Sequence, residues 1–494
     1  MMGTENRTGL LGRCRGFPRS GRSPRPGMAE QDEEGVSWPD TRSRATGLVL
    51  LSLVFFVGCR PGSVRPWEPN YDHLLHLTER ARSPVGPVEI VHVYSEFPDY
   101  RWVEAPGEGV ACVDDAARAA LLWLRRWDRT GEEEALTHVR HLLRFLVLMQ
   151  QPNGAFANFV DARLEPNLTA VSSRPCLSWW TVRAAWALAE GWHRFKSRDP
   201  AFADSLRESL LRLRAAMDSL VARYGMWEQG VAGRYPAWLV NGSGADATSV
   251  LVLALLRLRE MEGQAWADSL LPRLLEGILV MQVADSSDSL YGALLCFRDL
   301  WHAWGANQMY ALVRAWRALG DPRCLRAAEL EARHWRGRLL VCGFLHEVDR
   351  ASGRSRRYPQ IAYDIRPAVW GFLELADATG DSLWSVAAGL WASWLLGNNS
   401  DGVRMYDART GRTFDGLPEP GRLNRNAGAE STIEALLALE ALQGNPTAMR
   451  ALRARWESSW TEDGRTYRRA VTPEGVPYLL AHDGSGVSLV TSDR

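Results

Sequence analysis

The chain has 494 residues, of which 46% are hydrophobic and 23% are charged, the composition of an ordinary soluble globular protein. Its formal net charge at pH 7 is zero, so we do not expect electrostatic binding to nucleic acid or acidic lipid. Length alone would permit about three domains, but an internal repeat favours one large domain.

The N-terminal residues are typical of an export signal. Residues 1–40 are rich in Arg, Gly and Pro, which indicates disorder or an extension upstream of the true start. Residues 41–58 hold two arginines and then an apolar run that suits a signal peptide but is too short to span a bilayer. The run ends in FVGC at Cys59, which resembles a bacterial lipobox. We expect lipidation at Cys59 and an extracytoplasmic protein anchored to a bacterial membrane, with a plain signal peptide as the alternative.

Residues 59–85 are expected to form a linker and a first helix over Tyr71 to Arg82, and a strand should follow around Val88 to Tyr94. The five cysteines beyond Cys59 show no CxxC or Cys/His spacing, so we expect no structural zinc site. The sequence also shows no phosphate-binding Gly loop and no metal-binding His cluster, so we expect no metal and no cofactor. Cys112 and Cys176 could meet in an oxidising compartment, but buried thiols are the preferred interpretation.

Six apolar segments recur at spacings of 57 to 66 residues along the chain. Each follows a polar or aromatic residue, and each is too apolar all round for a surface helix, so we expect six buried helices. The opening residues are Asp115, Trp180, Asp246, Asn307, Asp364 and Glu430.

A second, amphipathic helix is expected after each buried one. The predicted outer helices are Glu132–Gln150, Phe202–Tyr224, Ala265–Met281, Pro322–Leu340, Ser382–Leu396 and Pro446–Trp456. Glycines should mark helix ends at Gly131, Gly225, Gly320, Gly380 and Gly444.

Six inner and six outer helices predict an all-α fold, a closed (α/α)6 toroid of six helical hairpins over residues 86–460. An open solenoid is the alternative, although solenoid repeats are usually shorter than the spacing here. Residues 461–494 carry strand-like runs between Gly and Asp turns and predict a small β-rich C-terminal tail.

A toroid gathers the N-termini of its inner helices at one end, where unsatisfied N–H groups and helix dipoles converge. Side chains at these positions combine carboxylates, amides and aromatic rings, the types that bracket sugar hydroxyls and stack on pyranose faces. The candidate residues are Asp114, Asp115, Trp179, Trp180, Trp238, Asp246, His302, Trp304, Asn307, Tyr363, Asp364, Arg366, Asn426 and Glu430.

Three segments resemble a known group of proteins. GVACVDDAARAALLWLRRW and LMQQPNGAFANFVD are similar to the "TDDNARA" and "NPDGRFRNF" types of motif in the six-hairpin glycosidase-like superfamily, and TFDGLPEPGRLNRNAGAESTIEALLAL supports the same resemblance. The resemblance covers about Val91 to Leu442, with Ala116 where the related motif has Asn. It implies a toroid that acts on carbohydrate, since the superfamily includes hydrolases, lyases, epimerases and members without established activity.

We expect Asp115 and Glu430 to be the catalytic pair, because the first and sixth inner helices of a closed ring are neighbours about 8–10 Å apart. Inverting glycoside hydrolases hold two carboxyls about 6.5–9.5 Å apart with a water between them. Glu430 would then donate the proton and Asp115 would activate the water, although the reverse assignment stays open.

Structural alternatives exist for the same acidic residues. Asp114, Asp115 and Asp246 can be N-caps. Ser431 with Glu434 has the spacing of a capping box, which leaves Glu430 without a structural duty.

Two other functions remain open. His302, Tyr363 and Arg366 are the residue types of a polysaccharide lyase or a sugar epimerase, although Arg366 can instead pair with Asp364. The third possibility is a non-catalytic glycan-binding lipoprotein. In every case the expected partners are an oligo- or polysaccharide and a membrane, through Cys59, and the protein is expected to be a monomer.

Overall fold

A computed structural model of the protein describes residues 67–261 and 265–490. The described residues from Pro69 onward belong to one compact unit. The predicted N-terminal extension, signal peptide and lipidation site at Cys59 lie outside the described residues. Within those residues, no helix has the length and apolar character that crossing a membrane requires.

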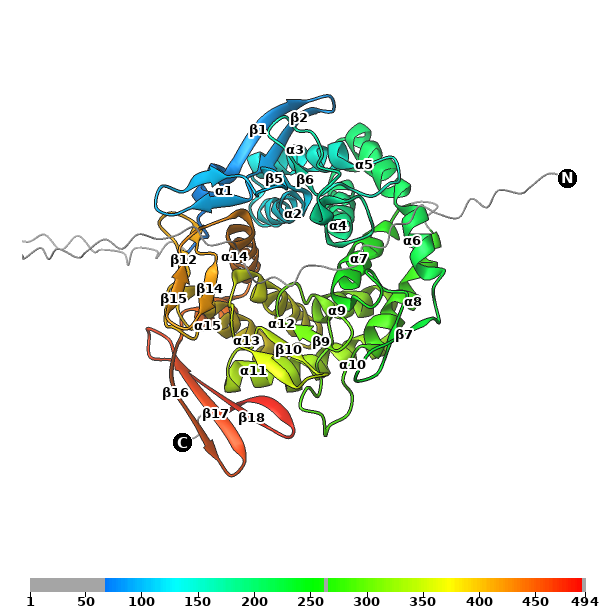
Figure 1. The fold of residues 1–494 in the computed structure, drawn as a ribbon. Coiled ribbons are helices and arrows are strands. Elements are labelled where there is room, and N and C mark those ends of the chain that lie inside the picture. The colour runs from blue at the N-terminus through cyan, green and yellow to red at the C-terminus, as the bar shows by residue number, and fades with distance from the viewer. Residues whose placement is uncertain (1–66, 262–264, 491–494) are drawn as a thin grey trace, which may run out of the picture. The chain divides into compact units, whose positions relative to one another are not determined.

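Six inner helices form a closed ring (Figure 1). Each contacts the next along the chain, and the sixth contacts the first, so the prediction of a closed toroid rather than an open solenoid is confirmed. Their apolar side chains are buried on all sides, as in ADATSVLVLALLRL of α7. The inner helices are α2 (Val113–Thr130), α4 (Trp179–Phe195), α7 (Ala245–Leu258), α9 (Gln308–Leu319), α12 (Arg366–Thr379) and α14 (Ala429–Leu442).

An outer layer of helices surrounds this ring and packs on it. It consists of α3 (Glu133–Met149), α5 (Pro200–Arg212), α6 (Arg214–Val221), α8 (Ala265–Val280), α10 (Pro322–Leu330), a π-helical turn (Glu331–Arg336), α11 (Gly337–Cys342), α13 (Ser382–Ala392), the 3-10 turn Ser393–Leu396 and α15 (Pro446–Leu452).

The helices depart from prediction in several places. The expected helix over Phe202–Tyr224 is two helices that meet at Leu213. The last outer helix ends at Leu452, because the chain then enters a strand at Arg455. Gly131, Gly320 and Gly380 end helices in the left-handed conformation, whereas α14 ends at Leu442 with a right-handed cap at Gln443, so Gly444 has no such role.

The first described helix is shorter than predicted. α1 (Asp72–Leu77) stops where β1 (Thr78–Ser83) begins, and β1 pairs antiparallel with β2 (Gly86–Val91). β2 packs on α3 and pairs along one edge with Thr78–Ser83. That pairing replaces the second half of the helix predicted for Tyr71 to Arg82.

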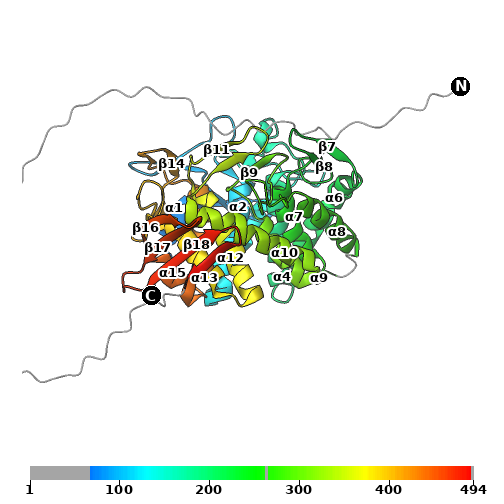
Figure 2. The same cartoon turned by 90° about the horizontal axis from the view of Figure 1, so that it is seen from below.

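Short strands collect at the end of the ring where the inner helices begin, because they lie in the connections that lead from each outer helix to the next inner one. Figure 2 shows several of them along one side of the helical layer. They are β3 (Tyr94–Glu96), β4 (Arg101–Val103), β5 (Ala111–Cys112), β6 (Phe159–Val160), β7 (Trp227–Gln229), β8 (Arg234–Pro236), β9 (Leu300–His302), β10 (Glu347–Asp349), β11 (Arg354–Arg356), β12 (Tyr406–Asp407), β13 (Arg412–Thr413), β14 (Gly416–Glu419) and β15 (Arg422–Asn424).

The C-terminal segment forms a four-stranded antiparallel meander, as the predicted β-rich tail requires. Its strands are β16 (Arg455–Glu462), β17 (Arg465–Val471), β18 (Pro477–Asp483) and β19 (Gly486–Val490). The sheet begins at Arg455, earlier than expected, and packs on α11 and the π-helical turn of the outer layer. The sheet therefore lies outside the ring of inner helices (Figure 1).

Candidate functional site

The first and last inner helices meet through one guanidinium group. Arg118 on α2 donates from Nη2 to Oδ1 of Asp115 at 2.6 Å and from Nη1 to Oε2 of Glu430 on α14 at 3.0 Å. Residues that are far apart in the sequence therefore lie side by side. Arg118 stands between the two carboxylates and prevents their direct contact.

The same guanidinium begins a chain of ion pairs across the inner helices. Arg118 reaches Oε1 of the buried Glu434 at 3.3 Å, and Arg366 on α12 donates to both Glu434 oxygens at 2.7 and 3.2 Å. Arg366 then donates to Oδ1 of Asn307 at the start of α9. The alternative pairing of Arg366 with Asp364 is therefore wrong. α14 has no side-chain cap, so the predicted Ser431–Glu434 capping box is also wrong.

A second group links α2 to α4. Arg183 lies 2.6 Å from Oδ1 of Asp114 and donates to the Tyr363 hydroxyl. The guanidinium groups of Arg118, Arg183 and Arg366 lie 5.2, 5.3 and 5.9 Å from the Tyr363 ring centre. Burial raises the pKa of Tyr363 to about 12. This hydroxyl therefore keeps its proton at neutral pH.

The two carboxyls of the expected pair differ in access to solvent. The Glu430 side chain is 45% exposed, whereas that of Asp115 is 6% exposed and also accepts from the Cys112 thiol at 3.1 Å. Burial raises the pKa of Asp115, and Arg118 opposes that shift. The pKa of Glu430 is raised by burial and by the Asp115 charge, again against Arg118. Neighbouring protein groups thus surround much of Glu430, but part of its side chain remains accessible to solvent.

The prediction of buried thiols holds for Cys112, which is buried and forms no disulfide in the described part of the chain. Instead of forming a disulfide, the Cys112 thiol donates a hydrogen bond to Asp115. Cys112 also accepts from the backbone N–H of Asp115 at 3.4 Å and so caps α2. The Cys112 sulfur is therefore the N-cap acceptor of α2, and the Asp115 carboxylate pairs with Arg118.

Sequence reasoning missed Tyr94, which stands on β3 beside the pair and is 45% exposed. Burial, together with the negative charges of Glu108, Asp115 and Glu430, raises the pKa of Tyr94 to about 12. An aromatic ring that is exposed next to a carboxylate pair is a natural surface for a sugar ring. The sequence could have indicated Tyr94 through its position at the end of the expected strand around Val88 to Tyr94, just ahead of the first inner helix.

Sequence reasoning also missed Arg118 and Arg183 and assigned Glu434 only to a capping box, although each lies three or four residues beyond a candidate residue. Such spacing places side chains on the same helix face, one turn deeper. A charged residue one turn into an otherwise apolar helix is a signal that could have been used.

His302 is held on both ring nitrogens. Its Nε2 lies 3.1 Å from Oδ2 of Asp246, its Nδ1 lies 2.7 Å from the Trp304 carbonyl oxygen, and the Trp304 ring stacks on it at 3.7 Å. Burial lowers the pKa of His302, but Cys296 and Asp246 outweigh it and raise the pKa to about 10. The ring of His302 is therefore fixed in place, and neither of its nitrogens is free to act as a base.

The candidate tryptophans divide into two kinds. Trp180 and Trp238 are at most 3% exposed, and their indole N–H groups donate to the backbone carbonyls of Phe156 and Arg273. They pack the interior, and we do not retain them as sugar platforms. Trp179 is also buried, against Arg183 and Trp304. Trp304 is partly exposed and lies near Tyr363.

The remaining candidates organise the loops. Asp364 is fully buried and accepts from the backbone N–H of Ile361 at 2.9 Å, with His346 Nδ1 at 3.2 Å. Asn307 donates to the Gly305 carbonyl at 2.8 Å. Asn426 accepts from the Phe97 N–H at 3.1 Å and so ties the β3–β4 turn to the segment before Glu430.

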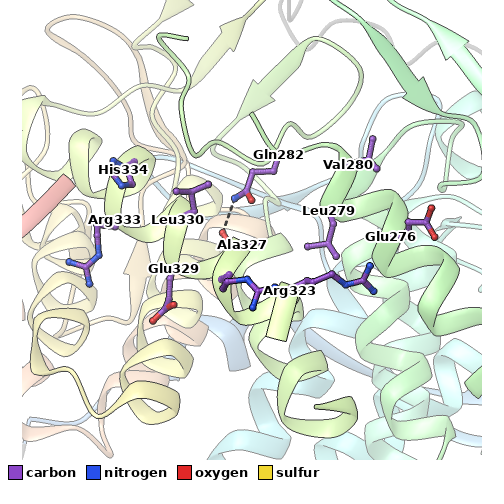
Figure 3. Close-up of a pocket in the computed structure, with 11 residues that line it drawn as sticks. Glu276, Leu279, Val280, Gln282, Arg323, Ala327, Glu329, Leu330, Arg333 and His334 are labelled. Carbon is purple, nitrogen blue, oxygen red and sulfur yellow. Dashed lines mark hydrogen bonds between the residues drawn. The ribbon is translucent and has the colours of Figure 1, made fainter. Parts of the chain in front are cut away.

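A groove of about 790 Å³ lies elsewhere, between the outer helices α8 and α10. Figure 3 shows that Glu276 and Leu279 of α8 face Arg323 and Leu330 of α10 across it. Gln282 closes one side by donating to the Ala327 carbonyl at 2.7 Å. None of the candidate residues lines this groove, so the candidate site remains the end of the ring.

Comparisons with known proteins support the architecture. No protein-family model and no curated protein matches the sequence. Cellobiose 2-epimerase from Bacillus thermoamylovorans is similar in structure, with a TM-score of 0.53, 13% identity and coverage of 75% of this chain and 95% of the other. Cellobiose 2-epimerase from Spirochaeta thermophila gives 0.50, 13%, 77% and 92%. The chain therefore has an (α/α)6 toroid fold similar to that of these structures, which is the fold that the resemblance implied.

Proposed function

We propose that the protein is a carbohydrate-active enzyme whose site lies where the inner helices begin, and that it hydrolyses an oligo- or polysaccharide. The observation that carries this proposal is the bridge from Asp115 through Arg118 to Glu430, with Glu430 open to solvent. Two carboxyls on adjacent helices, one accessible and one buried, supply the unequal environments that acid–base catalysis needs.

Glu430 is proposed as the proton donor to the glycosidic oxygen. Burial raises its pKa, so its protonated form persists to higher pH than that of an ordinary glutamic acid. Asp115 is proposed as the base that activates water, a role for which the Cys112 thiol must release Oδ2. Because Arg118 separates the two carboxyls, the wider spacing of inverting enzymes, about 6.5–9.5 Å, is the one we propose.

The rival mechanisms have less support from the site. Elimination or epimerisation needs a base that removes a carbon-bound proton. His302 is bonded on both nitrogens, and Tyr363 is bonded to Arg183 with a raised pKa. Arg366 is neutralised by Glu434, so it does not offer a free charge to a uronate.

A screen on a polysaccharide panel tests the proposal, and cello-oligosaccharides belong in it because the two similar structures named above are cellobiose 2-epimerases. Hydrolysis produces reducing ends, elimination produces ultraviolet absorbance, and epimerisation changes the sugar without new ends. We expect reducing ends from at least one glycan, and a loss of about 10²- to 10⁴-fold in kcat/KM for Glu430→Gln.

Asp377→Asn is the matched control, since Asp377 lies on the inner helix α12 near its far end and is 75% exposed. It should retain full activity. An ultraviolet absorbance that rises equally in the wild type and in Glu430→Gln would show that the reaction is elimination rather than hydrolysis. Binding of a glycan without any product would make the protein a binding module.

We also propose that the protein acts outside the cytoplasm and is held at a bacterial membrane by a lipid on Cys59. The FVGC run that ends at Cys59 supports this. Radiolabelled palmitate should label the wild type in bacterial cells and leave Cys59→Ser unlabelled. Equal labelling of the two proteins would reject the anchor.

A further inference from the structure

Three side chains of different chemistry converge beside the start of α7. Asp246 Oδ2, Cys296 Sγ and His302 Nε2 all lie within 4.8 Å of one another. All three residues are buried, with exposed fractions of 4% or less. The backbone brings them together, because the N–H of Ala245 donates to the Cys296 carbonyl at 2.8 Å.

Each of these side chains is also oriented by a second partner. Asp246 Oδ1 accepts from the Ala247 N–H at 2.6 Å, and His302 Nδ1 lies 2.7 Å from the Trp304 carbonyl oxygen. Gln308 donates from Nε2 to Cys296 Sγ at 3.5 Å. These contacts leave Oδ2, Nε2 and Sγ to face one another. Outer partners of this kind accompany the ligands in protein metal sites.

The oxygen–nitrogen edge of the cluster, its donor types and its charge suit zinc. The 3.1 Å separation of Oδ2 and Nε2 is close to the edge of about 3.3 Å that bonds of about 2.0–2.1 Å give in a tetrahedron. Nitrogen, sulfur and oxygen donors are all zinc ligands. A zinc ion with one carboxylate, one thiolate and one neutral imidazole also carries no net charge, which favours burial.

We propose that Asp246, Cys296 and His302 form a zinc site with a fourth position left to water. This goes beyond the proposed hydrolase activity, which does not use the metal. Zinc there joins the start of α7 to β9 and fixes His302 beneath the Trp304 ring. Sequence spacing did not identify the site, because Asp246 lies at a helix start 50 residues before Cys296, and the six-residue step from Cys296 to His302 is not a familiar zinc motif.

The competing arrangement is an ordinary buried ion pair. In it the Cys296 thiol donates to the His302 carbonyl at 3.3 Å, and protonated His302 pairs with Asp246. Both arrangements satisfy the same residues, but only the zinc site has a metal–sulfur bond. A measurement that detects this bond separates them.

The test uses the purified full chain, stripped with a chelator and then given Co²⁺ or Zn²⁺. Co²⁺ should produce a thiolate-to-cobalt charge-transfer band at one equivalent, and Zn²⁺ should abolish it by displacement. Cys296→Ser should lose the band, and Asp246→Asn should bind the metal at least about tenfold more weakly. Cys324→Ser, which alters a buried cysteine on α10 outside the cluster, should keep the band.

X-ray absorption on the zinc-loaded wild type keeps the inference testable if Cys296→Ser fails to fold. It should show one sulfur neighbour at about 2.3 Å. A shell of nitrogen and oxygen alone, or a cobalt band that persists in Cys296→Ser, would overturn the zinc site. Failure of the wild type to bind either metal would leave the ion pair as the correct description.

Discussion

Arg118 determines much of the local chemistry of the candidate site. It is 4% exposed and is bonded to Asp115, Glu430 and Glu434. A buried cation among three carboxylates offsets their mutual repulsion and keeps Asp115 and Glu430 close together. The acidic pair proposed here therefore depends on a basic residue that lies on the same helix as one of its members.

His73 gives a prediction about pH and stability. This buried histidine on α1 bonds the carbonyl of Ala427, just before α14, and burial lowers its pKa to about 4 from the ordinary 6.5. Between these values the unfolded chain binds more protons than the folded one, so stability falls as pH falls from 6.5 towards 4. The shift corresponds to about 3 kcal/mol.

Urea unfolding of the wild type and His73→Gln at pH 7 and pH 4.5 measures this contribution. Glutamine retains an N–H donor for Ala427 but does not titrate. The wild type should lose more stability between the two pH values than the variant does. Equal losses would show that His73 does not contribute.

At the scale of elements, close packing between helices depends on positions without a side chain. A Cβ on Gly389 of α13 would lie 2.2 Å from the Ala448 carbonyl oxygen and 2.7 Å from the Ala451 Cβ, both on α15. The short last helix α15 packs chiefly on α13. This contact therefore holds the end of the outer layer in place.

Gly389→Ala should lower the free energy of unfolding by about 1–3 kcal/mol, because the new methyl group meets backbone that cannot move aside cheaply. The steric cost of the new methyl group should exceed the gain of about 1 kcal/mol that alanine brings in helix propensity. Gly444→Ala is the control, since a Cβ there would meet nothing within 4 Å. A Gly389→Ala protein as stable as the Gly444→Ala protein would contradict the packing argument.

The inner helices could be predicted from the sequence because buried helices have an unmistakable apolar pattern, as in α7 and α14. The contacts among their polar residues could not. Trp238 occupies a loop near the expected cavity, but position in a loop does not reveal that the ring is buried against Tyr224 and Trp227. Glu434 has capping-box spacing, yet two arginines from other helices bind it. Such pairings depend on tertiary neighbours.

At the scale of the molecule, the closure of α14 against α2 is secured at both ends of the helices. Arg118 joins them where they begin, and Arg129 Nε donates to Oε1 of the buried Glu440 at 2.5 Å near their far ends. Tyr71 adds a hydrogen bond to Glu440 at 2.8 Å. The ring is thus closed by charged groups as well as by apolar packing.

Arg129→Met should destabilise the protein by about 3 kcal/mol, because it leaves the Glu440 carboxylate buried without its cation. The double variant Arg129→Met/Glu440→Met should recover part of that loss, since apolar side chains can replace a buried ion pair. Urea unfolding measures both. A double variant that is less stable than either single variant would argue against an ion pair at this junction.

The most direct test of the account is a double-variant cycle of kcat/KM, on the glycan that the screen identifies, for Asp115→Asn, Glu430→Gln and the two together. Residues that act as one catalytic unit have strongly non-additive effects. The double variant should therefore be no slower than the slower single variant. Losses that simply multiply would mean that the two carboxyls act independently, and the closed-ring active site would be wrong.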